Sequence, residues 1–237
     1  MTTLGLIGSG NIGSTVARLA VAAGYDVVLS NSRGPETLSD LVAELGPRAS
    51  AATAAEAAAA GDLVLVTVPL HAHDQVPVEP LAGKVVMDTN NYYPGRDGHI
   101  DALDRAEGTT SGLLQAHLPT SRVVKVFNNI FFVALAQLGR PAGAPDRSAL
   151  AVFGDDEGAK AEVSAFLDAI GYDALDAGTL AESWRAENGR PAYVMPYASD
   201  GDVTAPAPAT AEEVRELLAR ADRSRDPQPA SLDAPPS

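Results

Sequence analysis

The sequence predicts a doubly wound α/β fold, in which helices cover both faces of a parallel sheet. Three observations indicate this fold. A short apolar run over residues 3–7 leads into a Gly-x-Gly-x-x-Gly pattern and then into helical periodicity. Apolar runs and helical patterns then alternate as far as about residue 127. Finally, residues 62–69 are almost continuously β-branched or leucine, which is typical of a strand buried on both faces.

The glycine pattern carries the first functional prediction. A strand over Thr3–Ile7 followed by these glycines and a helix is the dinucleotide-binding fingerprint of Rossmann-type folds. Gly8 allows the tight turn, Gly10 lets the backbone approach a pyrophosphate, and Gly13 lets the helix pack closely on the strand. The free amides at the start of that helix can point at phosphates. An ordinary strand–turn–helix connection is the alternative, and the position of the motif favours cofactor binding.

The turn after the second strand specifies which cofactor is expected. The strand over Tyr25–Ser30 ends where the fingerprint normally has an Asp or Glu that binds the adenine ribose. This chain has Asn31, Ser32 and Arg33 there instead. A carboxylate would repel a 2′-phosphate, whereas a guanidinium binds it through two charge-assisted hydrogen bonds and a serine hydroxyl adds a third. The sequence therefore predicts NADP(H) rather than NAD(H).

The remaining elements define the rim of the expected site. Helices are expected over 35–45 and 54–60, and strands over 49–51, 62–69, 84–88 and 122–127. Ligands of doubly wound sheets bind at the carboxyl ends of the strands, near the point where the strand order reverses. Besides the glycine loop, this rule selects residues 68–71, 88–93 and 127–130. Val68 and Pro69 therefore join the predicted cofactor-binding residues.

Four residues on this rim are catalytic candidates that could contact a second substrate: Asn90, Tyr92, Tyr93 and Asn129. A tyrosine can stack on a flat heterocycle or donate a proton to a carbonyl. An asparagine amide can fix a carboxamide or a carbonyl oxygen. Structural roles stay open for all four, because the tyrosines could simply pack the loop and asparagine often bonds its own backbone in turns.

Other polar residues near the rim are given structural interpretations. His71, His73 and Asp74 have the residue types of a metal site, but an i,i+2 pair after a strand projects poorly onto one ion. No metal is predicted, and His71 stays a candidate substrate contact. Lys125 falls within a strand pattern and is interpreted as a surface or edge lysine.

Three regions follow along the chain. Residues 1–140 are expected to form the NADP-binding Rossmann domain, and residues 141–203 a small α/β region on the substrate side. Residues 204–237 are a Pro/Ala-rich tail, in which the segment 212–218 could dock as a helix. About the last fifteen residues are expected to be disordered, because Pro-rich polar sequence buries too little surface to become ordered.

The composition limits the classes of function. A hydrophobic content of 46% in 237 residues is enough to fill a core, and the absence of cysteine excludes disulfides and thiolate metal sites. A net charge of −14 argues against nucleic-acid and anionic-membrane partners. No run approaches the ~20 apolar residues of a membrane span, and the N-terminus lacks a secretory signal pattern. We expect a cytoplasmic protein that acts on a small-molecule substrate, and a homodimer remains open.

Several stretches resemble the NADPH-dependent oxidoreductases that use the deazaflavin coenzyme F420. They are LIGSGNIG (6–13), NSR (31–33), TVP (67–69), KVFNN (125–129), GDDE (154–157) and LDAGTL (175–180). The resemblance implies that a hydride passes between carbon 4 of nicotinamide and carbon 5 of the deazaflavin, with both rings stacked in one cleft. It also implies that Ser9, Ser32 and Arg33 hold the 2′-phosphate, and that Asn11 and Ile12 supply amides to the pyrophosphate.

Two features depart from that family. The polar, aromatic loop over residues 88–98 is longer than in the archaeal members, and residues 189–193 with the tail replace their apolar dimerisation segment. The leading prediction is an enzyme that transfers a hydride between NADP(H) and a second small molecule, with coenzyme F420 as the acceptor. An NADPH-dependent imine or carbonyl reductase is the alternative enzyme, and a non-catalytic NADP(H)-binding sensor is the alternative from another class.

Overall fold

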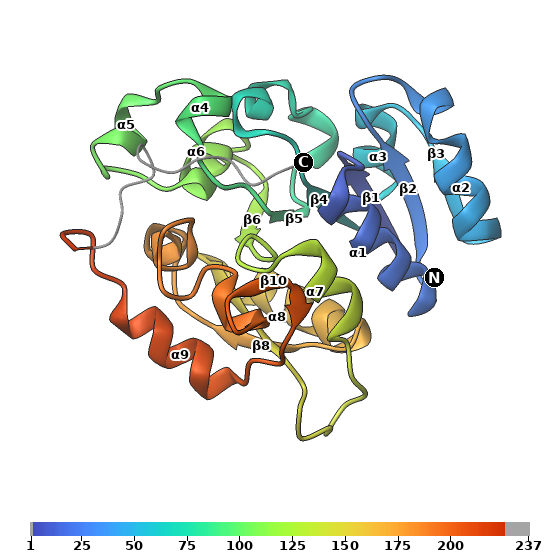
Figure 1. Cartoon of the computed structure of the whole chain (residues 1–237). Coiled ribbons are helices and arrows are strands. Elements are labelled where there is room, and N and C mark those ends of the chain that lie inside the picture. Colours follow the sequence, from blue (N-terminus) through green and yellow to red (C-terminus); the bar gives the residue numbers. More distant parts are fainter. Residues whose placement is uncertain (1, 226–237) are drawn as a thin grey trace.

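The computed structural model describes residues 2–225 and contains an eight-stranded sheet with the order β3-β2-β1-β4-β5-β6-β7-β8 (Figure 1). The strands are β1 (Thr3–Ile7), β2 (Asp26–Ser30), β3 (Ala49–Ala51), β4 (Leu63–Val66), β5 (Val85–Asp88), β6 (Arg122–Lys125), β7 (Ala149–Gly154) and β8 (Asp173–Asp176). Strands β1 to β6 are parallel, β7 is antiparallel to β6, and β8 is parallel to β7. The predicted Rossmann-type α/β fold is confirmed.

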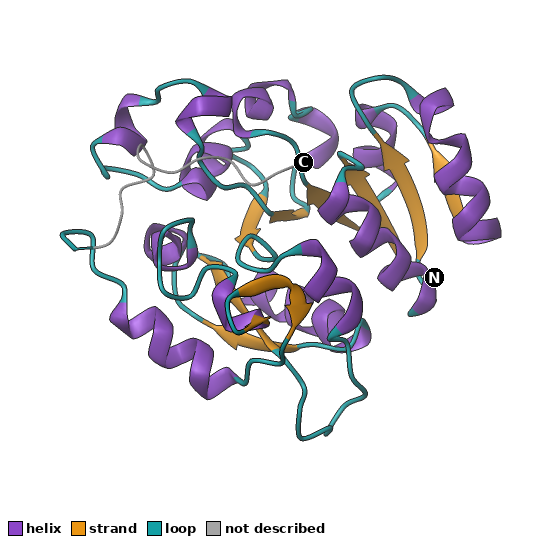
Figure 2. Cartoon of the chain, in the orientation of Figure 1, coloured by secondary structure: helices purple, strands orange, loops and turns teal. Residues whose placement is uncertain are grey.

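Helices cover both faces of this sheet (Figure 2). The helices within residues 2–225 are α1 (Asn11–Ala22), α2 (Ser39–Leu45), α3 (Ala54–Ala60), α4 (Pro94–Asp97), α5 (Asp101–Asp104), α6 (Thr110–His117), α7 (Phe132–Gln137), α8 (Glu157–Ala169) and α9 (Ala211–Arg220). Short 3₁₀ segments are η1 (Pro35–Leu38), η2 (Gly46–Arg48), η3 (Leu70–Gln75), η4 (Glu79–Leu81), η5 (Leu180–Ala186) and η6 (Met195–Tyr197). A separate antiparallel pair joins β9 (Ala198–Ser199) to β10 (Asp202–Pro206).

Two apolar clusters fill the two faces of the sheet. Along β4, Leu63 and Leu65 belong to the larger cluster, whereas Val64 and Val66 belong to the smaller one. The larger cluster includes side chains of α1, α7, α8 and α9, and the smaller includes side chains of α3 and α6. Successive side chains of a strand point to opposite faces, and apolar side chains cover both faces here. Every position of β4 is therefore buried. This explains the continuous apolar run from which the strand was predicted.

The strand order positions the site. Strand β1 lies between β2 and β4, so the chain winds outward in one direction through β2 and β3 and in the other through β4 to β6. A crevice opens beside the carboxyl ends of the strands at such a reversal. The glycine loop, the turn after β2 and the segment after β4 therefore meet at one edge of the sheet.

The C-terminal part extends the same sheet. Lys125 and Phe153 are register partners in the antiparallel pair β6–β7, and the larger apolar cluster runs from Leu4 to Leu218. One apolar core thus contains residues from all three regions expected from the sequence. The division at residues 140 and 203 stays a prediction. The expected disorder beyond residue 225 lies outside the described residues. Within residues 2–225, no helix combines the length and apolar character needed to cross a membrane.

Candidate functional site

A cavity of about 470 Å³ lies at the carboxyl ends of β1, β2 and β4. The glycine loop, the turn after β2 and the segment that follows β4 line it together. Among its lining residues are Gly8, Ser9, Gly10, Asn31, Ser32, Arg33, Val68 and Pro69, all selected from the sequence as cofactor-binding residues. Asn11, Ile12 and Gly13 begin helix α1 directly behind Gly10. The structure therefore brings the three predicted segments to one cleft.

The three glycines of the motif differ in what surrounds them. A Cβ atom on Gly8 would lie 2.3 Å from the Thr67 carbonyl oxygen, and Gly8 has a φ of 105° that other residues rarely adopt. A Cβ atom on Gly13 would lie 2.4 Å from the Gly8 carbonyl oxygen. A Cβ atom on Gly10, by contrast, would meet no atom within 4 Å. The fold requires the first and third glycines, whereas the second leaves open space at the helix start.

That open space has the chemistry of an anion site. Gly10 is the N-cap of the 12-residue helix α1, and no side chain caps the helix there. The first amides of a helix have no partner within it, and the helix dipole adds positive potential at that end. The amides of Asn11 and Ile12 could therefore bind a pyrophosphate that approaches past Gly10. The residues present fit a dinucleotide.

The turn after β2 is fixed by its own hydrogen bonds. Ser9 Oγ donates to the Ser30 carbonyl oxygen at 2.9 Å, and the Asn31 side-chain oxygen accepts from the Arg33 amide at 3.0 Å. The Asn31 amide group donates to Thr37 Oγ1 at 2.8 Å. Ser32 and Arg33 are exposed, and no carboxylate within residues 2–225 pairs with the Arg33 guanidinium. This cation is available to an anionic ligand in the cleft.

The two tyrosines after β5 are buried outside this cavity. Tyr92 donates from its hydroxyl to Asp104 Oδ1 at 2.7 Å and accepts from the Ile100 amide at 2.9 Å. Burial, followed by the hydrogen bond to Asp104, raises the pKa of Tyr92 to about 12. The Tyr93 hydroxyl pairs with that of Tyr193. These contacts describe loop packing, and the catalytic role of Tyr92 and Tyr93 stays a prediction.

The asparagines of the rim retain unused hydrogen-bonding capacity. Among residues 2–225, Asn90 Nδ2, Asn128 Oδ1 and Asn129 Oδ1 are buried without a partner. Asn129 Nδ2 donates to the Ala192 carbonyl oxygen at 3.1 Å, so one half of its amide is engaged. A buried polar atom without a partner is uncommon and calls for a ligand, a water or a functional role. Asn90 and Asn129 stay catalytic candidates.

The structure corrects the interpretation of Lys125. Its side chain is 0% exposed, not at the surface or at a sheet edge. The strand assignment itself was right, but β7 and β8 extend the sheet beyond β6 and make β6 an interior strand. The Lys125 ammonium group lies 3.5 Å from Glu187 Oε1, a partner distant in sequence. No local signal in the sequence indicated Glu187.

The histidine after β4 lies at the cleft. His71 lines the cavity, and its Nδ1 is 3.3 Å from Asp97 Oδ1. Burial alone would raise the pKa of Asp97, but hydrogen bonds from Arg96 and the Tyr93 amide outweigh it and hold the pKa low. Within residues 2–225, no group of three His, Asp or Glu side chains could hold a metal ion.

A second cavity of about 620 Å³ lies between α6 and η5. Its lining includes Thr109, Gln115 and Leu180 and contains none of the site residues selected from the sequence. Thr109 and Gln115 already use their polar groups on backbone carbonyls. The cavity at the glycine loop is therefore the candidate site.

Comparisons with known proteins agree with this geometry. Residues 3–92 match the model of a family described as NADP oxidoreductase, coenzyme F420-dependent. The metalloreductase STEAP3 of Rattus norvegicus is 30% identical over 186 residues, which cover 78% of this chain and 35% of the rat protein. The chain thus spans about a third of the length of that relative.

Two solved structures are similar over most of the chain. A hypothetical protein of Sinorhizobium meliloti, SMa0349, is 28% identical with a TM-score of 0.71, covering 82% of this chain and 94% of that one. A protein of Arthrobacter sp. FB24, provisionally named an F420-dependent NADP-reductase, is 26% identical with a TM-score of 0.66. It aligns with 77% of this chain and 87% of its own. The match over residues 3–92 and the similarity to the Arthrobacter protein both support a relation to the coenzyme F420-dependent NADP oxidoreductases.

Proposed function

We propose that this protein transfers a hydride between NADP(H) and the deazaflavin coenzyme F420. The observation that carries the proposal is the cleft that combines the open space at Gly10 with the exposed Arg33 guanidinium. The match of residues 3–92 to the family model supports NADP as the cofactor and F420 as the acceptor. When bound, NADPH supplies a hydride from its nicotinamide ring.

The three segments that line the cleft would contact different parts of the cofactor. Arg33 and Ser32 would bind the 2′-phosphate, and Ser9 stabilises their turn through its hydrogen bond to the Ser30 carbonyl oxygen. The amides of Asn11 and Ile12 would bind the pyrophosphate at the start of α1. Val68 and Pro69 from the segment after β4, with the other glycine-loop residues, close the cleft around the dinucleotide.

Hydride transfer between two heterocycles makes modest demands on side-chain chemistry. It requires orientation of the two rings and exclusion of water rather than an obligatory acid or base. Asn90 and Asn129 could orient a carboxamide or a carbonyl through their unpartnered atoms. An imine or carbonyl reductase would additionally need a proton donor. The Tyr93 hydroxyl, which pairs with that of Tyr193 outside the cavity, is the candidate donor for this alternative.

An anaerobic absorbance experiment tests the proposal. The protein is mixed with NADPH and coenzyme F420, and loss of the deazaflavin absorbance is followed, with flavin, simple ketones and cyclic imines as separate acceptors. We expect bleaching of the deazaflavin that depends on enzyme concentration. Turnover of a ketone or imine without bleaching would assign the alternative enzyme class. Tight NADPH binding with no acceptor reduced would assign the sensor.

Replacing Arg33 with alanine tests the cofactor assignment separately. Because the guanidinium has no carboxylate partner within residues 2–225, its removal should cost only ligand contacts. We expect NADPH affinity to fall about tenfold to a hundredfold while NADH affinity stays unchanged. Arg18→Ala is the matched control, since Arg18 is an exposed arginine of α1 that pairs with Glu44. Equal affinity of the wild type for NADPH and NADH would contradict the assignment.

A further inference from the structure

A buried cluster of charged and hydroxyl side chains lies beneath the loop after β5. We call it the Lys125 cluster, and its members come from β5, β6, the start of α6 and the segment after η5. They are Asp88, Thr110, Ser111, Lys125 and Glu187. None of them lines either cavity. The cluster is therefore not part of the cleft wall, and any role in binding must act through the residues that it contacts.

The ammonium group of Lys125 uses all three of its hydrogens. Its Nζ donates to Thr110 Oγ1 at 2.5 Å, to the Asn90 carbonyl oxygen at 2.8 Å and to Ser111 Oγ at 3.2 Å. The carboxylates of Glu187 and Asp88 lie 3.5 Å and 3.9 Å from the same nitrogen. Burying such ions rarely adds stability over apolar packing, so the cluster needs a different explanation.

The loop residue that the cluster holds is Asn90. Asp88 Oδ1 accepts from the Asn90 amide at 3.0 Å, and the Asn90 carbonyl oxygen accepts from both Lys125 Nζ and Thr110 Oγ1. Both backbone polar groups of Asn90 are thus fixed by the cluster. The residue is 3% exposed, and within residues 2–225 its Nδ2 has no partner. The cluster fixes the Asn90 backbone, while the Asn90 amide group is buried without a hydrogen-bond partner.

The position of Asn90 relative to the cleft follows from the strand order. Arg33 and Ser32 lie after β2, and the glycine loop lies after β1. A dinucleotide that places its adenosine phosphate at β2 and its pyrophosphate at β1 continues toward β4 and β5. The Thr89 amide donates to the Val66 carbonyl oxygen at 3.2 Å, so the loop after β5 is attached to β4. The loop that carries Asn90 therefore lies on the side of the cleft toward which the nicotinamide half would extend.

We propose that Lys125 is a positioning residue, which holds the Asn90 backbone so that the Asn90 carboxamide can bind the nicotinamide half of the cofactor. The proposal rests on NADP(H) as the cofactor of the proposed function and is independent of the deazaflavin. Glu187 and Asp88 compensate the buried cation, and Thr110 shares its hydroxyl among Lys125, Asn90 and Glu187. Next to the cluster residue Glu187, Asn188 also attaches the segment after η5 to the same loop, since its Nδ2 donates to the Tyr92 carbonyl oxygen.

The test compares two ligands that differ only in nicotinamide. Dissociation constants are measured by calorimetry for NADPH and for 2′-phospho-ADP-ribose, which lacks the nicotinamide ring. The dissociation constant for 2′-phospho-ADP-ribose divided by that for NADPH reports the contribution of the nicotinamide half alone. In Lys125→Met we expect this ratio to fall about tenfold, as loss of the fixed Asn90 amide removes one to two hydrogen bonds, while 2′-phospho-ADP-ribose binds as in the wild type.

A milder pair of variants keeps the test valid if Lys125→Met does not fold. Thr110→Val removes the shared hydroxyl at nearly constant volume, and Thr110→Ser restores it. We expect the ratio to fall about threefold in Thr110→Val and to return to the wild-type value in Thr110→Ser. An unchanged ratio in folded Lys125→Met, or in Thr110→Val if the former is unfolded, would overturn the proposal.

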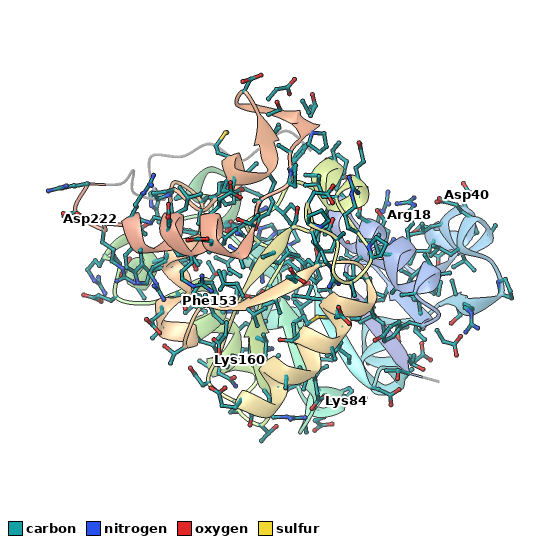
Figure 3. The ribbon with its side chains drawn as sticks, turned by 90° about the horizontal axis from the view of Figure 1, so that it is seen from below. Arg18, Asp40, Lys84, Phe153, Lys160 and Asp222 are labelled. Carbon is teal, nitrogen blue, oxygen red and sulfur yellow. The ribbon has the colours of Figure 1, made fainter. Side chains whose placement is uncertain are left out.

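Lys160→Met is the matched control. The Lys160 side chain, labelled on α8 in Figure 3, is also buried and pairs with Asp176 at 2.8 Å. The start of α8 lies beside Arg122, the first residue of β6, at the opposite edge of the sheet from the cleft. We expect a lower Tm and an unchanged ligand ratio.

A wild type that binds both ligands but reduces no deazaflavin would refute the proposed acceptor and leave the Lys125 test intact.

Discussion

Replacing Gly10 with alanine is expected to weaken NADPH binding by about 100-fold or more without lowering Tm. The added Cβ atom would meet no protein atom within 4 Å, and the Gly10 backbone, with φ of −74° and ψ of −161°, suits any residue. The same Cβ atom would occupy the space through which a pyrophosphate reaches the amides of Asn11 and Ile12. Calorimetric titration with NADPH and a thermal melt measure the two effects.

Gly95→Ala is the matched control for this variant. Gly95 lies in helix α4, a Cβ atom added to it would meet no atom within 4 Å, and it does not line the cleft. We expect it to leave both NADPH affinity and Tm close to the wild-type values. If Gly10→Ala bound NADPH as tightly as Gly95→Ala, the pyrophosphate would not pass at Gly10. A large fall in Tm for Gly10→Ala would instead show that the folded loop has no space for a Cβ atom at this position.

The cleft at the glycine loop could be predicted from the sequence because its determinants are local. The turn at Gly8 and the close approach at Gly13 depend on residues within one strand–loop–helix unit and on Thr67, which follows the neighbouring strand. The exposed Arg33 follows β2 closely, at the distance that the fingerprint specifies. Short sequence separation fixes such features before the rest of the fold is known.

The environment of Lys125 could not be predicted, because it depends on distant segments. A lysine inside a strand pattern is usually exposed, and only the pairing of β6 with β7 makes this strand interior. Glu187 reaches the cluster from a segment far along the chain, beyond β7, α8 and β8. Tyr193 is a further example, because its hydroxyl pairs with that of Tyr93 although the two residues are far apart in the sequence. Pairings of this kind follow from topology, not from local pattern.

The C-terminal helix shows the limit of compositional reasoning. The proline-rich stretch around Pro206 and Pro208 indicated a tail, and the segment after it was expected only to be able to dock. In the structure this segment forms α9, which begins with Thr210 and Glu213 in a capping box. Helix α9 packs against β7 and β8 and belongs to the larger apolar cluster. Apolar spacing, rather than overall composition, was the informative signal.

Removing the buried face of α9 is therefore expected to destabilise the whole domain. Val214 and Leu218, one helical turn apart, are 0% and 3% exposed in the larger apolar cluster. Replacing both with alanine should lower the free energy of unfolding by about 3–6 kcal/mol, through lost burial and the cavity left behind. Since a domain has only about 5–15 kcal/mol in total, we expect Tm to fall by roughly 10 °C or more.

Arg215→Ala provides the comparison on the same helix, because Arg215 is exposed and alanine is at least as good a helix former. Its free energy of unfolding should stay within about 0.5 kcal/mol of the wild type in chemical denaturation. If the double variant instead matched Arg215→Ala, α9 would contribute nothing to the core, and residues 204–225 would behave as the separate tail that their composition indicates. The double variant should also lose NADPH binding only when it unfolds, since neither side chain lines the cleft.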